Sequence, residues 1–207
     1  MPIRLLFLLW GFIFSKELKK LIKNLFTMTN LVNCLENFQI YVGTYKKYRE
    51  GSIFGEWLQL SNYSDYDELL KAMKELHKDE ADPEFMIQDF ECNSFFVNQN
   101  LISECFLSES IFEIAEKIEN SGYDIEIFEA FTDCFGNYKN IDELLDSVSD
   151  SYMGSFDSDT DFVENLLTET DSIPQNLPSY LYIDWERTAR DLMMDYSTSN
   201  NHYFRCL

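Results

Sequence analysis

The most suggestive spacing in the chain is three aspartates at alternate positions, Asp157, Asp159 and Asp161. This i, i+2, i+4 pattern opens a calcium-binding loop, in which carboxylate oxygens surround the ion. The rest of the loop does not fit. Its sixth position, which needs a glycine for the turn, is Phe162, and its twelfth, which needs a bidentate glutamate, is Thr168. We therefore expect no metal here and interpret the aspartates as helix-capping and surface carboxylates.

Other residue types that support catalysis or metal binding are too few or wrongly spaced. The five cysteines form no Cys-x-x-Cys pair, which argues against zinc, and we interpret them as reduced thiols of a cytosolic protein. Neither histidine is expected to be catalytic; His77 falls in the last turn of a predicted helix, where the helix dipole favours a partly positive imidazole. No nucleophile elbow, phosphate-binding glycine loop or His-Glu-x-x-His motif occurs. A glycosidase needs two carboxyl groups at defined positions in a cleft, rather than acids spread evenly over the surface. We expect no enzyme and no cofactor.

Carboxylates dominate the polar groups of the chain. Asp and Glu number 37 against 16 Lys and Arg, for a formal net charge of −21. Residues 37–207 alone hold 35 acids and 11 bases, or −24. Such a surface repels nucleic acid and anionic membranes and attracts cationic surfaces. We therefore expect a basic protein as the partner, and no direct binding to nucleic acid.

The acids are densest between residues 104 and 171, where 19 acids accompany only two bases. Apolar residues recur there at helical spacing, which predicts short amphipathic helices with buried stripes. The stripes are Ile111, Ile114, Ala115 and Ile118; Ile125, Phe128 and Phe131; and Ile141, Leu144, Leu145 and Val148. Folding then leaves the carboxylates outside. Fifteen of them, which we call the carboxylate array, are candidates for partner contact: Glu109, Glu113, Glu116, Glu119, Glu126, Glu129, Asp133, Asp142, Glu143, Asp146, Asp150, Asp157, Asp159, Asp161 and Glu164.

The density of this charge is close to that of DNA. A compact body of 171 residues has a diameter of roughly 40 Å, so 24 net charges along it give about one per 1.7 Å, the value for the duplex axis. Carboxylates at i and i+4, such as Glu109 and Glu113, lie about 5–6 Å apart on one helix face. Such an array could occupy a basic groove built for phosphates. The alternative is an ordinary solvated helix face.

The elements that position these carboxylates predict an α+β fold of three small domains with a strongly acidic surface. The first domain (37–103) is α+β, the second (104–150) is the acidic helical stretch, and the third (151–207) is again α+β. In the first domain we predict strands at 38–45, 53–60 and 85–90, and a helix at 65–77 capped by Ser64. In the third we predict helices at 159–169, capped by Asp159 or Thr160, and at 179–192, and a last strand at 203–207.

Residues 1–36 differ from the rest and form an N-terminal extension. An apolar run from Leu5 to Phe14, interrupted by Gly11, precedes a basic amphipathic stretch. The run is too short to span a bilayer comfortably, and no small-residue cleavage site follows it. A membrane-surface anchor is one interpretation. We favour the other, in which this segment is not part of the functional fold, Met28 could serve as the start, and membrane association is not expected.

Three motifs follow one another along residues 38–207. The first is a hairpin motif that consists of Tyr41-Val42-Gly43 followed by Tyr48, Gly51, Gly55 and Trp57, with no proline after the second strand. The second is residues 85–91, which read FMIQDFE. The third is residues 182–192, which read YIDWERTARDL. Together they resemble the ArdA-type antirestriction proteins, small acidic proteins of mobile elements and phages. That family has a hairpin, an F-x-I-x-D-x-E strand and a Y-I-D-Y-x-x-Y-G-R-D-L helix in this order. Ala189 stands where the family usually has glycine.

The resemblance implies an elongated, three-part molecule that dimerises through its C-terminal domain and mimics bent duplex DNA. It implies a stoichiometric inhibitor that occupies the DNA site of type I restriction-modification enzymes in the cytoplasm of the bacterial host. The mixed apolar and acidic segment 156–167 is the candidate homodimer contact, with Phe156, Phe162, Val163 and Leu166 as its apolar residues. Two alternatives stay open. One is an acidic adaptor or chaperone for another basic DNA-binding protein, and the other is a membrane-associated protein that uses residues 5–14.

Overall fold

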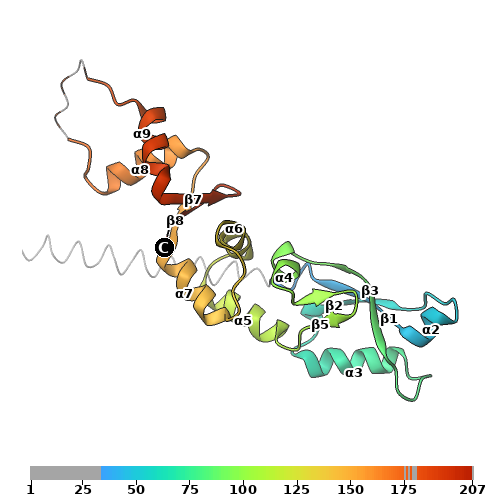
Figure 1. Cartoon of the computed structure of the whole chain (residues 1–207). Coiled ribbons are helices and arrows are strands. Elements are labelled where there is room, and N and C mark those ends of the chain that lie inside the picture. The colour runs from blue at the N-terminus through green and yellow to red at the C-terminus, as the bar shows by residue number, and fades with distance from the viewer. Residues whose placement is uncertain (1–33, 175, 177, 179–180, 207) are drawn as a thin grey trace, which may run out of the picture. The chain divides into compact units, whose positions relative to one another are not determined.

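The computed structural model describes residues 34–174, 176, 178 and 181–206, all within one compact unit (Figure 1). The apolar run and basic stretch predicted before residue 34 lie outside these residues. In the part that is described, no helix is both long and apolar enough to cross a bilayer. The described residues form eight α-helices and three small antiparallel sheets, so the predicted α+β class is confirmed.

The first sheet has the strand order β2-β1-β3, with β1 antiparallel to both neighbours. Its strands are β1 (Gln39–Thr44), β2 (Glu56–Gln59) and β3 (Phe85–Glu91). The predicted hairpin and third strand are confirmed, although β2 is shorter than the predicted 53–60. A short helix, α2 (Tyr45–Arg49), follows β1, and a 3-10 turn, η1 (Leu60–Asn62), follows β2. Alternation along β1 turns Ile40 and Val42 to the buried face.

Helix α3 (Tyr66–Leu76) runs beside this sheet (Figure 1), and its Leu69 and Met73 share a hydrophobic cluster with Ile40 and Val42. Ser64 was predicted as its cap, but the capping residue is Asp65. The Asp65 carboxylate accepts a hydrogen bond from the Glu68 N–H at 2.8 Å. Ser64 instead donates its own N–H to the Glu68 carboxylate at 2.7 Å. Serine and aspartate are both strong caps, so the sequence alone did not choose between adjacent positions.

Replacing Asp65 by alanine is expected to lower the free energy of unfolding by about 1 kcal/mol, because the first turn of α3 loses its cap. Ser64→Ala is the matched control. It is expected to have the smaller effect, because the backbone N–H that binds Glu68 survives the substitution. Urea unfolding followed by circular dichroism measures both variants. Equal losses would assign the cap to neither residue alone.

Helices α5 (Ile111–Ser121), α6 (Ile125–Phe135) and α7 (Ile141–Ser151) confirm the predicted helical stretch. Eight of the predicted stripe residues are buried: Ile111, Ala115, Ile118, Ile125, Phe128, Phe131, Leu144 and Val148. Ile114, Ile141 and Leu145 are half-buried. Three short elements that the sequence analysis did not predict precede these helices: α4 (Ser94–Asn98), β4 (Ile102–Ser103) and β5 (Phe106–Leu107). Helix α4 packs on α6, with the ring centroids of Phe95 and Phe128 6.2 Å apart.

The third sheet has the order β6-β8-β7 and is built from β6 (Tyr152–Ser155), β7 (Tyr196–Ser199) and β8 (His202–Arg205). Strand β8 overlaps the predicted last strand, whereas β6 and β7 were not predicted. The β7–β8 hairpin turns at Asn200 and Asn201, whose φ angles are 48° and 65°. A two-residue hairpin turn of type I′ needs two residues with positive φ, and asparagine tolerates that conformation.

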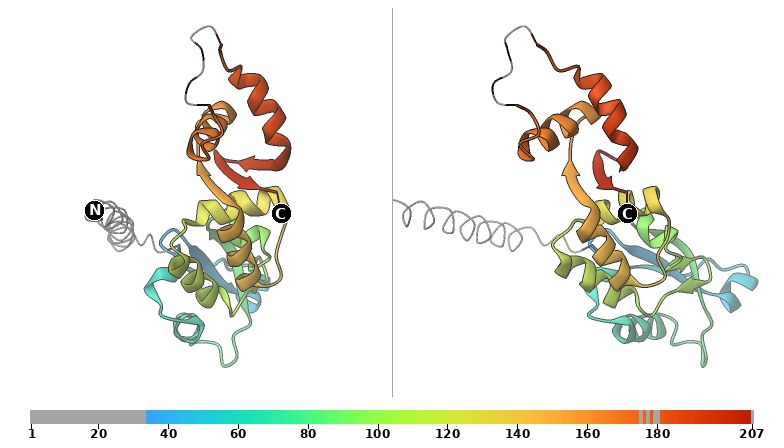
Figure 2. Two further views of the ribbon diagram at one scale, coloured as in Figure 1. Left: turned by 90° about the vertical axis from the view of Figure 1, so that its left-hand side faces the viewer. Right: turned by 60° about the vertical axis from the view of Figure 1, so that its left-hand side comes forward.

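Helices α8 (Asp159–Glu169) and α9 (Trp185–Leu192) lie side by side (Figure 2). The span of α8 agrees with the prediction, but its cap is Ser158, whose hydroxyl accepts from the Asp161 N–H at 3.2 Å. Neither Asp159 nor Thr160 fills that role, because both are already in the first turn. The predicted start of α9 at residue 179 is wrong. Asp184 caps the helix, which begins at Trp185 and is followed by the 3-10 turn η2 (Met193–Asp195).

Two hydrophobic clusters hold these elements together. The larger one runs from Leu35 through the first sheet and α3 to α7, and it includes Phe204. The smaller one consists of Phe162, Val163, Ala189 and Tyr203. Tyr203 and Phe204 are neighbours on β8, and successive strand residues point to opposite faces. Strand β8 therefore contributes one aromatic ring to each cluster.

Candidate interaction surface

The carboxylate array lies on α5 to α8 and on the segments just before α5 and α8. Thirteen of its fifteen members are exposed, and Glu119 and Glu129 are half-buried. Exposure follows from the helical period, because the acids alternate with the buried stripes. What the members do within the fold differs, however, and divides them into two groups.

Two members hold parts of the chain together. Glu119 accepts a hydrogen bond from the backbone N–H of Cys34 at 3.0 Å. Glu129 accepts one from Asn93 Nδ2 at 3.0 Å and another from the Ser94 hydroxyl, which ties α6 to the start of α4. Both glutamates are half-buried because these contacts lie at junctions between elements. They contribute to the fold, so they are weaker candidates for partner contact than their exposed neighbours.

Three further members accept hydrogen bonds from hydroxyl groups. The pairs are Asp133 with Ser199 at 3.1 Å, Asp159 with Tyr203 at 2.8 Å, and Asp161 with Ser158 at 2.6 Å. Burial raises the pKa of Tyr203 to about 12, and the hydrogen bond to Asp159 adds to this shift. Of the three alternating aspartates, Asp159 and Asp161 thus have hydrogen-bond partners within the fold. In the part of the chain that is described, no three His, Cys, Asp or Glu side chains are grouped to hold one.

Lys117 is the base that pairs with the array. Its Nζ lies 3.1 Å from Glu113, one turn earlier on α5, and 2.9 Å from Asp142 on α7. The hydrogen bonds with Asp142 and then Glu113 raise the pKa of Lys117. Since Lys117 is half-buried but both carboxylates are largely exposed, the pairs link α5 to α7 without adding much stability.

The remaining eight members make no side-chain hydrogen bond or ion pair with any other residue that the structure describes. They are Glu109, Glu116, Glu126, Glu143, Asp146, Asp150, Asp157 and Glu164, and all eight are exposed. On α7, Glu143, Asp146 and Asp150 are three and four positions apart and share one helix face. These eight carboxylates are free to contact a partner.

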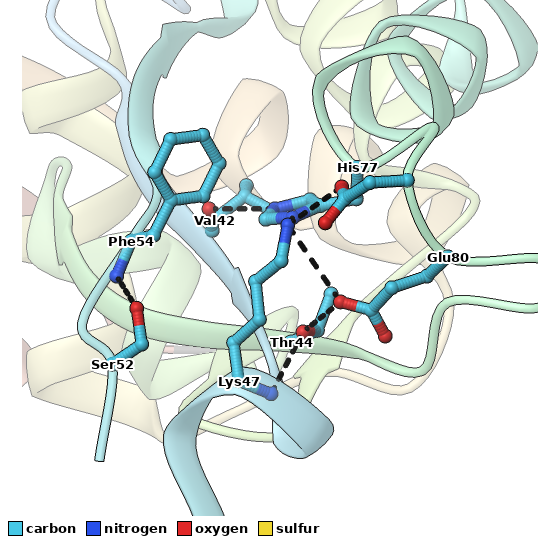
Figure 3. Close-up of polar contacts among 8 residues, drawn as sticks. Val42, Thr44, Lys47, Ser52, Phe54, His77 and Glu80 are labelled. Atoms are coloured by element: carbon cyan, nitrogen blue, oxygen red, sulfur yellow. Dashed lines mark hydrogen bonds and ion pairs between the residues drawn. The ribbon is translucent and has the colours of Figure 1, made fainter. Parts of the chain in front are cut away.

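His77 is fully buried at the end of α3 and has a structural role (Figure 3). Its Nδ1 lies 3.1 Å from Lys47 Nζ, and its Nε2 lies 3.2 Å from the Val42 carbonyl oxygen. A lysine ammonium can only donate, so Nδ1 accepts and the Nε2–H donates to Val42. The imidazole is therefore neutral, and the predicted partly positive ring is corrected. Lys47 also pairs with Asp79 at 2.8 Å and with Glu80 at 3.7 Å.

All five cysteines are free, and their surroundings differ. Burial raises the pKa of Cys34 to about 12, with a further contribution from Glu119. Burial also raises the pKa of Cys92 to about 11. Cys105 and Cys206 are exposed. Because the thiolate is the reactive form, the two half-buried thiols, Cys34 and Cys92, are poor nucleophiles.

Iodoacetamide at pH 8 is therefore expected to alkylate Cys105 and Cys206 well before Cys34 and Cys92, as measured by peptide mass spectrometry. The same shifts give the fold a pH dependence. Unfolded thiols lose their protons near the ordinary pKa of 9.0, whereas Cys34 and Cys92 keep theirs to higher pH. The contribution of these two thiols to stability should therefore be constant below about pH 9 and be lost as the pH rises toward 12. Uniform alkylation of all five thiols would contradict this assignment.

The four candidate dimer residues differ in how deeply they are buried. Phe162 and Val163 are 1% and 0% exposed, and both lie in the smaller hydrophobic cluster. Phe156 and Leu166 are half-buried and pack against that cluster. A second copy that contacts this segment would therefore meet Phe156 and Leu166, together with exposed acids of α8, rather than Phe162 or Val163. The dimer contact itself stays a prediction.

Comparison with known proteins identifies the family. No curated protein sequence matches the chain. The sequence profile of the family described as "Antirestriction protein (ArdA)" matches residues 40–205. This range runs from β1 to β8 and contains every member of the carboxylate array. The chain therefore belongs to the ArdA antirestriction protein family.

Proposed function

We propose that the protein inhibits type I restriction-modification enzymes by presenting the carboxylate array where those enzymes bind DNA phosphates. Membership of the antirestriction family supports the target class. The observation that carries the mimicry is the set of eight exposed carboxylates that pair with no other described residue. Charge that the fold does not neutralise is available to neutralise a basic partner.

The physical basis is the exchange of one polyanion for another. Lysine and arginine side chains in a DNA site release counterions when they meet phosphates. They would meet carboxylates held on helices instead. On α7, Glu143 and Asp150 are seven residues apart, which corresponds to about 10 Å at 1.5 Å per residue. With Asp146 between them, the charge spacing is about 5 Å, against 3.4 Å along one DNA strand, and the other helices add further charge.

Two consequences follow for association. Opposite charges steer the partners together, so binding should be fast at low ionic strength and should weaken with salt. We also propose that the protein acts as a homodimer, joined through its C-terminal part, in the cytoplasm of the bacterial cell where the restriction enzyme works. It needs no catalytic step, because occupation of the DNA site is sufficient for inhibition.

A competition assay tests this function. A purified type I methyltransferase complex is bound to a labelled duplex, and the protein is titrated in at two salt concentrations. We expect stoichiometric displacement of the duplex that weakens steeply at the higher salt. No displacement at either salt concentration would refute the proposal. A pull-down that recovers only a histone-like protein, without a restriction subunit, would instead support an acidic adaptor for a basic DNA-binding protein.

A further inference from the structure

The first sheet carries a surface hollow of about 520 Å³ on the face opposite α3. Tyr41 of β1 lies between its register partners Trp57 of β2 and Asp89 of β3, so the three side chains share this face. Tyr48 and Glu104 also line the hollow. Among the described residues that line it, two are acids and none is Lys or Arg. The hollow therefore combines aromatic walls with unbalanced negative charge.

The aromatic walls form a corner. The ring centroids of Tyr41 and Trp57 are 5.5 Å apart, and the ring planes meet at 67°. Trp57 is 41% exposed and Tyr48 is 53% exposed, so much of their ring surface faces solvent. The face of an aromatic ring carries negative partial charge and attracts cations, most strongly in the case of tryptophan. A flat cation could therefore stack here on exposed ring surface.

The Asp89 carboxylate and the backbone of Glu104 are held in place at the rim by hydrogen bonds. The Phe90 N–H donates to the Asp89 carboxylate at 2.9 Å. Glu104 lies in the β4–β5 turn, and its backbone carbonyl accepts from the Ile87 N–H at 3.1 Å, which holds that turn against β3. Neither carboxylate forms an ion pair with a described residue. Their charge is available to a cation in the hollow.

The loop before β2 holds its wall of the hollow in place. The Tyr41 hydroxyl donates to the Ile53 carbonyl at 3.2 Å. Next along the chain, the Phe54 ring lies 4.5 Å from Lys47 Nζ and 5.7 Å from the ring of the buried His77, among the residues that Figure 3 draws. A Cβ on Gly55 would lie 2.4 Å from the Val42 carbonyl oxygen, so only glycine lets the loop come this close to β1.

A β-bulge adds an unpartnered donor. Asp89 pairs with Tyr41 and Ile87 with Val42, which leaves Gln88 as an extra residue on β3. Gly43 provides the space for the Gln88 amide, because a Cβ there would lie 2.3 Å from Nε2. Gln88 Nε2 is buried and has no hydrogen-bond acceptor among the described residues. A buried donor without a partner is unfavourable, and a ligand that supplies an acceptor would remove this penalty.

We propose that this hollow receives an arginine side chain of a partner protein. We call it the aromatic pocket and define it as Tyr41, Tyr48, Trp57, Gln88, Asp89 and Glu104. The planar guanidinium stacks on the aromatic corner and donates its in-plane N–H groups to the rim carboxylates. A carbonyl oxygen of the partner accepts from Gln88 after a small shift. Lysine fits less well, because its ammonium is strongly hydrated and cannot stack.

This inference rests on the proposed function only for the identity of the protein that carries the arginine. The pocket lies on the first sheet, whereas the array lies on α5 to α8. It would therefore give the protein a point of specific recognition, in contrast to the distributed attraction of many carboxylates. Binding of arginine can be measured without any restriction enzyme, so the two proposals fail independently.

The test uses the full-length protein labelled with 5-fluorotryptophan. The chain has three tryptophans, Trp10, Trp57 and Trp185. The variants Trp57→Phe and Trp185→Phe assign the ¹⁹F signals. We expect N-acetyl-arginine methylamide to shift the Trp57 signal saturably, with a dissociation constant on the order of 1–10 mM. The lysine analogue should bind at least threefold more weakly. The citrulline analogue, which is nearly isosteric and uncharged, should cause no saturable shift.

Variants locate the site. Asp89→Asn and Glu104→Gln are each expected to weaken arginine binding threefold or more, whereas Asp67→Asn on α3, an exposed acid outside both the pocket and the array, should leave it unchanged. An equal shift of the Trp185 signal, an equal response to citrulline, or no loss in both rim variants would overturn the proposal. Circular dichroism spectra of the two rim variants that match the wild-type spectrum exclude unfolding as the cause of weaker binding. If arginine binding fails while duplex displacement persists, only this inference is refuted.

Discussion

A variant that neutralises Glu116, Glu143, Asp146 and Asp150 is expected to lose between a few-fold and several-hundred-fold of its affinity for a type I enzyme at low salt. Each exposed charge pair is worth about 0.2–1 kcal/mol, and four such losses combine to that range. All four carboxylates are exposed and pair with no other described residue, so the fold does not need them. The salt dependence of duplex displacement should become less steep at the same time.

The matched control exchanges Asp for Glu and Glu for Asp at the same four positions, which keeps the charge and changes only side-chain length. It should displace the duplex nearly as well as the wild type. The neutralised variant should be at least as stable as the wild type to heat, since like charges have been removed. Displacement that is unchanged in strength and in salt dependence after neutralisation would rule out these carboxylates as the DNA mimic.

Phe204→Ala is expected to lower the free energy of unfolding by about 3–5 kcal/mol, the usual range for a buried phenylalanine. Phe204 is 0% exposed. Its ring centroid lies 5.4 Å from those of Phe131 and Tyr152 and 6.3 Å from that of Phe135. The truncation leaves a cavity between β8 and the central helices. Denaturant unfolding, with fluorescence and circular dichroism recorded together, measures the loss.

Two variants control for this result. Phe204→Leu keeps most of the apolar volume and should be clearly less destabilising than Phe204→Ala. Tyr182→Ala removes another large aromatic ring, but one that is 89% exposed, and its effect should stay within about 0.5 kcal/mol. A loss below about 1 kcal/mol for Phe204→Ala would mean that β8 does not anchor the C-terminal elements to the larger cluster.

The amphipathic helices could be predicted from the sequence because their signal is local. The stripe Ile125, Phe128 and Phe131 repeats at the helical period over one short segment, and all three residues are buried on α6. The same reasoning located β1 and β3, where β-forming residues follow one another. In each case the alternation of apolar and polar residues that packing requires lies within one short, continuous segment of the sequence.

The elements that were missed lack such a pattern. Strand β6 reads Tyr-Met-Gly-Ser and β7 reads Tyr-Ser-Thr-Ser, with neither a sustained apolar alternation nor a length that separates them from loops. They become strands because β8 lies between them and pairs with both. Helix α9 was predicted too long, because the residue types did not indicate that residues 181–184 are outside the helix and that Asp184 caps it.

The candidate site was predictable in part. Exposure of the carboxylates follows from helical periodicity, and thirteen of the fifteen are exposed. Their partners do not follow, because Glu119 meets Cys34 across 85 positions and Glu129 meets Asn93 across 36. The aromatic pocket was hidden for the same reason. It gathers side chains from three strands, helix α2 and the β4–β5 turn, and no single segment carries its signal.

Lys117 gives the array a further property. It is the base that pairs with these acids in the described part of the chain. Most of the repulsion between the acids is therefore reduced only through screening by dissolved cations. Added salt should therefore stabilise the folded protein and at the same time weaken its proposed binding to a basic partner. Opposite trends of this kind create an optimum. Under the proposed mechanism, a bacterium that accumulates potassium during osmotic stress would stabilise the inhibitor and weaken its binding to the target at the same time, so that escape from restriction depends on the water balance of the cell.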